Sequence, residues 1–263
     1  MSRSMWIAAS GMMAQQLNID VIANNLANVN TVGYKKSRAD FEDLMYQKIT
    51  LSQADNQGNV DQSVTLQVGL GVRNVGTPKI YSEGNIAQSN NQFDLAIEGD
   101  GFFQVQLPGG EYGYTRAGDF KKNADGYLTT ADGYMLLPAI QIPATAIDVA
   151  ISPDGNISVT KVGETTSTQI GQLQLASFAN PAGLENIGRN VVKQTGASGD
   201  PMIEPPGTNG VGTLAQGYLE NSNVDIAEEM IKMIMAQRAY EINSKAIQSS
   251  DEILAMTNNL RRG

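Results

Sequence analysis

Carboxylates are the main groups in this sequence that could perform acid–base or metal chemistry, because it contains no histidine and no cysteine. Without histidine there is no Ser-His or Cys-His nucleophilic site, and the commonest metal ligand is missing. Asp119, Asp125 and Asp132 lie close together in sequence, but they lack the spaced oxygens and the twelfth-position Glu of an EF-hand. Since two of them precede a glycine, we interpret these aspartates as residues of tight turns.

Two glycine-containing segments could in principle bind phosphate groups, but their sequence context argues against it. Residues 99–101 (Gly-Asp-Gly) are followed by neither a Gly-Lys-Ser/Thr run nor the start of a helix. Residues 69–71 (Gly-Leu-Gly) lie within an alternating strand pattern rather than between a strand and a helix. We therefore predict no catalytic, cofactor-binding or metal site, and we predict that the protein is not an enzyme.

Charge and hydropathy argue against two classes of partner. The formal net charge is −9, and the largest basic cluster is residues 35–38, so nucleic acid is not an expected partner. No apolar stretch approaches the length of a membrane span, so we expect no direct membrane insertion. Gln15, Gln16 and Asp20 interrupt the N-terminal apolar run, which argues against a cleaved signal peptide.

The longest regular pattern lies at the C-terminal end, where apolar residues follow two adjoining heptad stripes. One stripe contains Ile226, Met233, Tyr240, Ile247 and Leu254. The other contains Met235, Ala239, Ile242, Ala246, Ile253, Met256 and Leu260. Neither Gly nor Pro interrupts residues 224–260, which predicts one helix of about 35 residues, capped by Ser222 or Asn223. Two stripes form a wider apolar surface than one partner helix covers.

A matching stripe at the N-terminal end predicts that the two ends of the chain pair with each other. Its apolar residues recur in steps of three and four, with Gln16 in one polar position: Met5, Ala9, Met12, Ile19, Ala23 and Leu26. Asparagine-rich sequence follows and places the helix end near residues 28–30. Both a parallel and an antiparallel pair are compatible with the pattern.

The pattern changes from helical to alternating in the middle of the chain. Residues 38–46 are predicted to form a short helix or an extended arm, residues 50–63 a surface loop or mobile segment, and residues 64–72 one strand. Asp-Gly pairs indicate hairpin turns, in which Gly126 and Gly133 are expected at positive φ. Further short strands are predicted at residues 93–97, 103–107, 147–151, 157–159 and 173–175.

These patterns predict an α+β fold, with long terminal α-helices that pair as a coiled coil and a β-rich central region of hairpins inserted between them. Residues 1–30 and 224–263 are expected to form the terminal helical domain. Residues 31–92 and 193–223 are expected to form a connecting arm and β region, with a mobile loop at about residues 50–63. Residues 93–192 are expected to form an outer β-rich domain.

Two segments resemble the signatures of bacterial flagellar rod and hook proteins. The first is residues 24–35, in which we single out Asn24, Asn25, Leu26, Ala27, Asn28, Asn30, Thr31, Gly33 and Tyr34. The second combines residues 217–225 and 237–245, in which we single out Gln237, Arg238, Ala239, Tyr240, Glu241 and Asn243. Within the family, residues 40–47 and 66–76 are similar to those of the proteins that form the distal rod.

The resemblance implies a structural protein of the bacterial flagellar basal body, which polymerises helically into the hollow, rigid distal rod and transmits torque to the hook. The implied partners are further copies of the chain, proximal rod proteins, the hook protein, the outer ring (bushing) proteins and the flagellar export apparatus. A periplasm-spanning location is also implied, reached by type III export without a cleaved signal peptide. The resemblance also implies that residues 50–63 correspond to the insertion that, in this family, separates the stiff rod from the bendable hook.

We expect the assembly interface to draw on all the apolar stripes of the two terminal helices. Its expected residues are Met5, Ala9, Met12, Ile19, Ala23, Leu26, Ile226, Met233, Tyr240, Ile242, Ile247, Ile253, Leu254, Met256 and Leu260. Three alternatives remain compatible with the sequence. A hook-type or proximal-rod axial subunit would share the terminal helices. A cell-wall carbohydrate-active enzyme would bring two carboxylates together in a β-domain cleft. An adhesin-like module with a coiled-coil stalk would form a closed oligomer instead of an open polymer.

Overall fold

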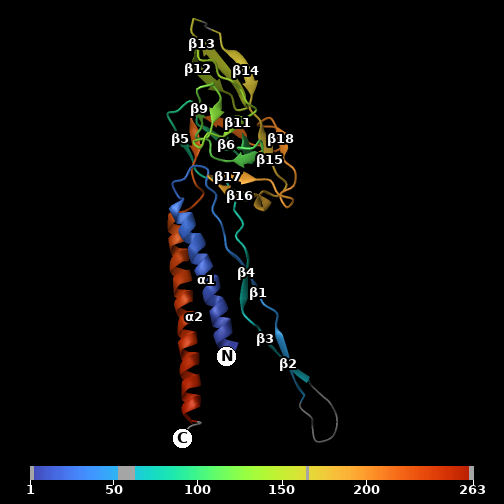
Figure 1. The fold of residues 1–263 in the computed structure, drawn as a ribbon, viewed down its shortest axis with the longest axis vertical. Helices are drawn as coiled ribbons and strands as arrows, with labels where there is room; N and C mark the ends of the chain where they lie inside the picture. Colours follow the sequence, from blue (N-terminus) through green and yellow to red (C-terminus); the bar gives the residue numbers. More distant parts are fainter. Residues whose placement is uncertain (1–2, 53–62, 164–165, 261–263) are drawn as a thin grey trace. The chain divides into compact units, whose positions relative to one another are not determined.

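The computed structural model describes residues 3–52, 63–163 and 166–260 (Figure 1). Two long helices, α1 (Arg3–Ala27) and α2 (Ile226–Leu260), are separated by short β-strands, which confirms the α+β fold class. The chain divides into two compact units. Unit 1 contains Met1–Asn25, Ser37–Pro78 and Ile226–Gly263, and unit 2 contains Leu26–Lys36 and Lys79–Asp225. The three-part division expected from the sequence stays a prediction.

Both helices of unit 1 follow their sequence patterns closely. The helix α2 has the predicted length, and Glu228 and Glu229 in its first turn suit the positive end of the helix dipole. The helix α1 ends at Ala27, just before the predicted position, because Asn28 and the asparagines after it favour a turn over a helix. Within the described ranges, neither helix carries an apolar stretch that would cross a membrane.

The rest of unit 1 is an extended, two-stranded arm. Strand β1 (Asp40–Asp43) pairs antiparallel with β4 (Val72–Gly76), so the extended alternative for residues 38–46 is the correct one. Strand β2 (Gln47–Ser52) pairs antiparallel with β3 (Ser63–Val68). The single strand predicted at residues 64–72 is wrong. The structure has two strands there, β3 and β4, separated by residues 69–71, in which Gly71 has a φ of +114°.

The loop predicted at residues 50–63 is wrong at its two ends. Residues 50–52 belong to β2 and Ser63 begins β3, and the two strands pair from Gln47 opposite Val68 to Ser52 opposite Ser63. The alternation of Val64, Leu66 and Val68 predicted part of β3, but the polar run that begins at Ser52 made its partner β2 resemble the start of a loop. Residues 53–62 lie outside the described residues, so the mobile loop predicted there stays a prediction.

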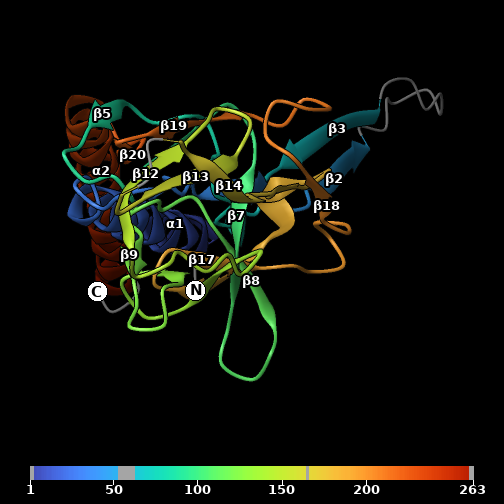
Figure 2. The same ribbon diagram turned by 90° about the horizontal axis from the view of Figure 1, so that it is seen from above.

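Unit 2 is built on an antiparallel sheet of nine strands. Its main path runs in the order β16-β17-β8-β7-β11-β10-β9, and β15 joins β7 to β18. The strands are β7 (Phe102–Gln106), β8 (Tyr112–Thr115), β9 (Lys121–Lys122), β10 (Leu128–Thr129), β11 (Met135–Leu137), β15 (Leu175–Ser177), β16 (Glu185–Gly188), β17 (Val191–Lys193) and β18 (Met202–Glu204). The hairpin of β7 and β8 projects from this sheet in Figure 2.

Smaller antiparallel pairings complete unit 2. A three-stranded sheet contains β12 (Ala146–Ile151), β13 (Asn156–Lys161) and β14 (Thr168–Gln172), and a short 3-10 helix, η1, covers Pro181–Gly183. The chain returning toward α2 pairs with the chain that entered the unit. There β19 (Thr213–Gln216) lies beside β6 (Leu95–Glu98), and β20 (Tyr218–Glu220) lies beside β5 (Ile86–Gln88).

Apolar alternation predicted the long strands of unit 2 better than the short ones. The strands expected at residues 103–107, 147–151 and 157–159 correspond to β7, β12 and β13. The strand expected at residues 93–97 begins only at Leu95, and the one at residues 173–175 is wrong because Leu173 lies between β14 and β15. The expected positive φ is confirmed for Gly126 (+90°) and Gly133 (+87°).

Unit 2 has two apolar clusters, supplied by alternating residues of β7. Phe103 and Val105 belong to the larger cluster, in which Phe103 meets Phe120 edge-on at 5.0 Å between ring centroids. Phe102 belongs to the smaller cluster, with Tyr114 and Phe178. Because successive residues of a strand point to opposite faces, one short strand contributes to both clusters.

Candidate assembly interface

The helices α1 and α2 approach each other in antiparallel directions within unit 1. The hydroxyls of Ser4 and Ser250 lie 3.2 Å apart. A Cβ atom on Gly11 would lie 2.9 Å from the amide nitrogen of Asn243, so the two backbones come close there. At the other end of α1, the Asn25 amide donates a hydrogen bond of 3.1 Å to Glu229. As the residue number rises along α1, the number of its partner on α2 falls.

The residues in these contacts are small or polar and recur every seven residues. On α1 they are Ser4, Gly11 and Asn25, with Asn18 at the missing step, and on α2 they are Glu229, Asn243 and Ser250, with the buried Ala236 at the missing step. We call this set the polar seam. The large apolar residues of the predicted stripes are one or more positions away from it.

The predicted interface residues of α2 divide between two faces. Met233 and Ile247 are half-buried and follow the polar seam in steps of three and four. The face that carries Ile242 and Leu260 is open, with those side chains 66% and 84% exposed. The exposed members of the predicted set on α2 are Ile226, Tyr240, Ile242, Ile253, Leu254, Met256 and Leu260. A single copy therefore leaves most of the predicted interface of α2 uncovered.

The predicted stripe on α1 does not coincide with the contacts to α2. Met5, Ala9, Met12, Ile19 and Leu26 are half-buried, and Ala23 is exposed. Trp6 and Met13, which widen this apolar face, are also exposed. On a third face of α1, the Ser10 hydroxyl accepts a hydrogen bond from Val72 of the arm, and Ala14 is buried. The helix thus has separate faces for α2 and for the arm.

The asparagine-rich motif forms the end of α1 and the turn after it. Asn24, Asn25 and Ala27 are helical, and Asn28, Asn30, Thr31 and Gly33 lie in the turn. The Thr31 hydroxyl donates a hydrogen bond of 3.2 Å to Asn28 Oδ1. Gly33 needs its φ of +67° and its missing side chain, since a Cβ atom would lie 2.5 Å from the Ala117 nitrogen. Tyr34 is buried beneath the ammonium group of Lys79.

The second motif lies on α2 and supplies part of the polar seam. Asn243 and Ala239 are half-buried, whereas Gln237, Arg238 and Glu241 are exposed. The preceding residues 217–225 lie in unit 2, where Asn223 accepts a hydrogen bond from the Lys36 backbone instead of capping the helix. The Ser222 hydroxyl accepts one from the backbone nitrogen of Val224, which precedes the first residue of α2, Ile226, so this bond is a turn contact and does not cap the helix.

Sequence reasoning missed a buried ion cluster that joins three distant segments of unit 2. Glu220 is 1% exposed and accepts hydrogen bonds of 2.5 Å from Lys35 and 2.9 Å from Arg116. Lys35 and Arg116 are also buried. Lys35 donates to the carbonyl oxygen of Ser82, and Arg116 donates to those of Gly99 and Gly101. Lys35 and Glu220 each lie within one of the two motif segments, but nothing in the sequence indicated that they pair.

The electrostatics of this ion cluster are dominated by burial and by the two opposite charges. Burial lowers the pKa of Lys35, against the opposing influence of Glu220. Desolvation would raise the pKa of Glu220, but the attraction and hydrogen bond of Arg116 outweigh it, so that pKa lies below its ordinary value. Because its pKa is lowered, Glu220 is ionised at neutral pH and faces the two buried basic side chains as a carboxylate.

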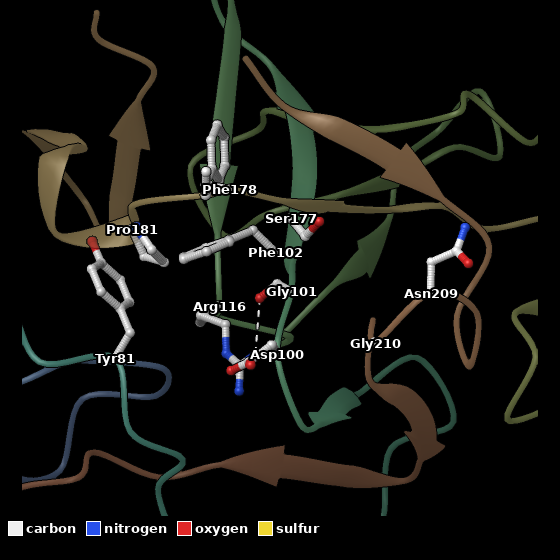
Figure 3. A pocket seen from close by; sticks show the side chains of 11 residues that line it. Tyr81, Asp100, Gly101, Phe102, Arg116, Ser177, Phe178, Pro181, Asn209 and Gly210 are labelled. Atoms are coloured by element: carbon white, nitrogen blue, oxygen red, sulfur yellow. Dashed lines mark hydrogen bonds between the residues drawn. The ribbon is translucent and has the colours of Figure 1, made fainter. Parts of the chain in front are cut away.

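A pocket of about 300 Å³ lies beside the smaller apolar cluster (Figure 3). Figure 3 shows Arg116 directed at the Gly101 carbonyl rather than free for a ligand. Among the described residues that line it, Asp100 is the one carboxylate. Burial raises the pKa of Tyr81, at the pocket wall, to about 12. The pocket thus lacks the paired carboxylates of a glycosidase, and the described ranges contain no group of three acidic residues able to hold a metal.

Family models place these elements in the axial structure of the bacterial flagellum. The model of the flagella basal body rod protein matches residues 5–35, which are α1 and the turn after it. That of the flagellar hook protein FlgE/F/G D1 domain matches residues 96–159. The third, the flagellar basal body rod FlgEFG protein C-terminal, matches residues 215–260 and includes α2.

Full-length relatives narrow this class to one kind of protein. The flagellar basal-body rod protein FlgG of Buchnera aphidicola subsp. Schizaphis graminum is 52% identical over 95% of this chain and 96% of its own. FlgG of Borreliella burgdorferi is 48% identical over 100% of both chains, and FlgG of Bacillus subtilis 40% identical over 100% of both. The chain belongs to the flagellar basal-body rod protein family. It is a structural rod subunit of the basal body and not an enzyme.

Proposed function

We propose that this chain polymerises helically into the hollow, rigid distal rod and transmits torque to the hook. The observation that carries the proposal is the distribution of apolar side chains on the two helices. Small and polar residues meet in the polar seam, whereas large ones such as Ile242, Ile253 and Leu260 remain exposed on α2. Exposed apolar surface of this extent marks a site of protein association.

We further propose that α1 and α2 form an antiparallel coiled coil. Three contacts support it, between Ser4 and Ser250, Gly11 and Asn243, and Asn25 and Glu229. Their heptad spacing is that of a coiled-coil core, and small residues there allow a close approach of the helices. Residues 1–30 and 224–263 would then line the tube, residues 31–92 and 193–223 would connect, and residues 93–192 would face outward.

The exposed stripes of α2 are better explained by contacts with neighbouring copies in an open polymer than by a closed dimer. A contact between unlike faces of two copies repeats without closing and generates a helical polymer. The half-buried stripe of Met5, Met12 and Ile19 on α1 is a different face that would receive the exposed stripe of α2. Interdigitated apolar side chains are as dense as an organic crystal, and that density supplies the stiffness a drive shaft needs.

The remaining partners follow from this place in the basal body. We propose that the rod spans the periplasm, begins on proximal rod proteins, turns within the outer ring (bushing) proteins and ends at the hook protein. The flagellar export apparatus would deliver the chain without removing a signal peptide. The hook alternative is less favoured, since the hook protein FlgE of Helicobacter mustelae, 42% identical, covers only 52% of this chain and 30% of its own length.

Electron microscopy of the purified, concentrated protein tests the proposal directly. The wild-type chain should form hollow tubes, and Ile242→Asp should abolish them, because a carboxylate replaces an apolar contact between copies. The matched control is Ile147→Asp in unit 2, where the isoleucine is equally exposed at 65% and lies on neither helix. Unit 2 should melt normally in both variants. Tubes that form as readily with Ile242→Asp as with the control would refute the proposed interface.

A further inference from the structure

The polar seam contains one network that is far more buried than its other contacts. Asn25 and Glu229 are 1% and 2% exposed, and their side chains bond at 3.1 Å. The Asn25 amide also donates to the Ser37 carbonyl at 2.8 Å, while its oxygen accepts from the Ser37 nitrogen at 2.9 Å. The side chain of Asn25 therefore makes three hydrogen bonds here, two with Ser37 and one with Glu229.

The carboxylate of Glu229 is held from its own helix as well. Lys232 lies 2.9 Å from Glu229 and 2.9 Å from Glu228. Desolvation lowers the pKa of Lys232, but its bonds to the two glutamates outweigh that effect and raise it. Both oxygens of Glu229 thus have a donor, one from α1 and one from α2.

Only one axial alignment of the helices preserves these bonds. A shift of one heptad in one direction places Asn25 opposite Ala236, whose side chain accepts no hydrogen bond. A shift in the other direction places Asn25 beyond Ile226, the first residue of α2. Asn25 cannot follow Glu229, because its amide is fixed to Ser37. Either shift breaks the bond that the Asn25 amide donates to the buried carboxylate of Glu229, and losing a donor to a buried carboxylate is costly.

We infer that the Asn25–Glu229 pair sets the axial register of the two terminal helices. The other seam positions, small residues such as Ser4, Gly11 and Ala236, discriminate poorly between alignments shifted by one heptad. A buried polar pair in a coiled-coil core is a known means of fixing register. The inference rests on the proposed helix pairing, and it gives Asn25 and Glu229 a positioning role within it.

The absence of native cysteine makes the register directly measurable by disulfide formation. Three double variants share Ser4→Cys, and add Ser250→Cys for the observed register or Asn243→Cys or Thr257→Cys for a shift of one heptad either way. A shift of one heptad moves a residue by about 10 Å along the helix, beyond the reach of a disulfide. Each variant is incorporated as a minority into polymers of wild-type chain, so that assembly is supplied by the majority and only the minority can crosslink.

The 4–250 disulfide should form fastest in the otherwise wild-type background. Glu229→Leu should reduce its rate advantage over the two shifted pairs by about tenfold, since the apolar side chain accepts no bond from Asn25. Glu229→Gln keeps an acceptor oxygen and should retain most of the advantage. Glu229→Leu leaves the Asn25–Ser37 bonds intact, so its effect reports on register and not on the arm.

An undiminished preference for the 4–250 disulfide in Glu229→Leu would overturn the inference while leaving the helix pairing in place. If Glu229→Gln loses the preference as fully as Glu229→Leu does, the hydrogen bond is not what sets the register, and the inference also fails. A wild-type background with no preference among the three pairs would instead refute the proposed pairing itself. The two ideas are therefore separable in one set of measurements.

Discussion

The buried ion cluster around Glu220 is the residue-scale feature with the largest expected effect on stability. Glu220→Gln removes the carboxylate that bonds both Lys35 and Arg116, which are buried. Breaking a buried pair by removing one partner costs about 3–5 kcal/mol, because the remaining charge is uncompensated. The change should be measured as the free energy of unfolding of unit 2 in urea at neutral pH.

The cluster also predicts how the free energy of unfolding depends on pH. The direction of that dependence follows from the lowered pKa of Glu220. Its pKa is lowered in the folded protein, so its contribution is present above the ordinary carboxyl pKa and is lost as pH falls through the folded pKa. The stability gap between wild type and Glu220→Gln should therefore shrink below about pH 4. Glu111→Gln, at the exposed pair with Lys193, is the control and should cost under about 1 kcal/mol at any pH. A gap that stays constant into acid would contradict this account.

Two turn glycines separate backbone strain from steric crowding. A Cβ atom at Gly133 meets nothing within 4 Å, so Gly133→Val carries only the cost of positive φ, about 1–2 kcal/mol. At Gly126 a Cβ atom would lie 2.5 Å from the Ile142 carbonyl oxygen, so Gly126→Val should cost more. Thermal melting of unit 2 measures both. Equal melting temperatures for the two variants would show that the crowding at Gly126 is relieved, and unchanged melting of both would refute the strain.

At the scale of elements, the sequence predicted those helices and turns that a periodic pattern or a turn motif marks. The uninterrupted heptads defined α2, and Asp-Gly pairs located the turns at Gly126 and Gly133. Short strands such as β9 and β10, of two residues each, were beyond reach, because they have no period to detect. The strand β3 was predicted in part by its alternating Val64, Leu66 and Val68, but its partner β2 was missed because it runs into a polar segment that resembles a loop.

The faces of the helices were only partly predictable, and for a physical reason. Periodicity of large apolar residues identified wide surfaces, and on α2 most of these residues are exposed in one copy, whereas those on α1 are mostly half-buried. The contact between α1 and α2 uses Ser, Gly and Asn, which a search for apolar residues passes over. Their recurrence every seven residues was the available signal. The Lys35–Glu220–Arg116 cluster gave none, since its partners are distant in sequence and charged.

At the scale of the whole molecule, the free monomer should have two regions of different stability. The terminal helices are expected to be largely unfolded in dilute, unassembled protein, because isolated helices are marginal and the polar seam buries little apolar surface. Hydrogen exchange should show weak protection of residues 3–27 and 226–260, strong protection of β7, and protection of all three after assembly. Strong protection of both helices before assembly would contradict this view, which also explains how the chain could travel through a narrow export channel.

The unequal lengths of the helices bear on how a shaft resists shear. The contact of Ser4 with Ser250 is close to the start of α1, yet α2 continues for ten more residues to Leu260, or about 15 Å. A stack of blocks with flush ends slips along the planes between its layers. Subunits with projecting ends overlap their neighbours, so each junction between layers is spanned by a segment of the adjacent subunit. The projecting turns of α2, which carry Ile253, Met256 and Leu260, would act as such bridges and pass twisting load from one layer to the next.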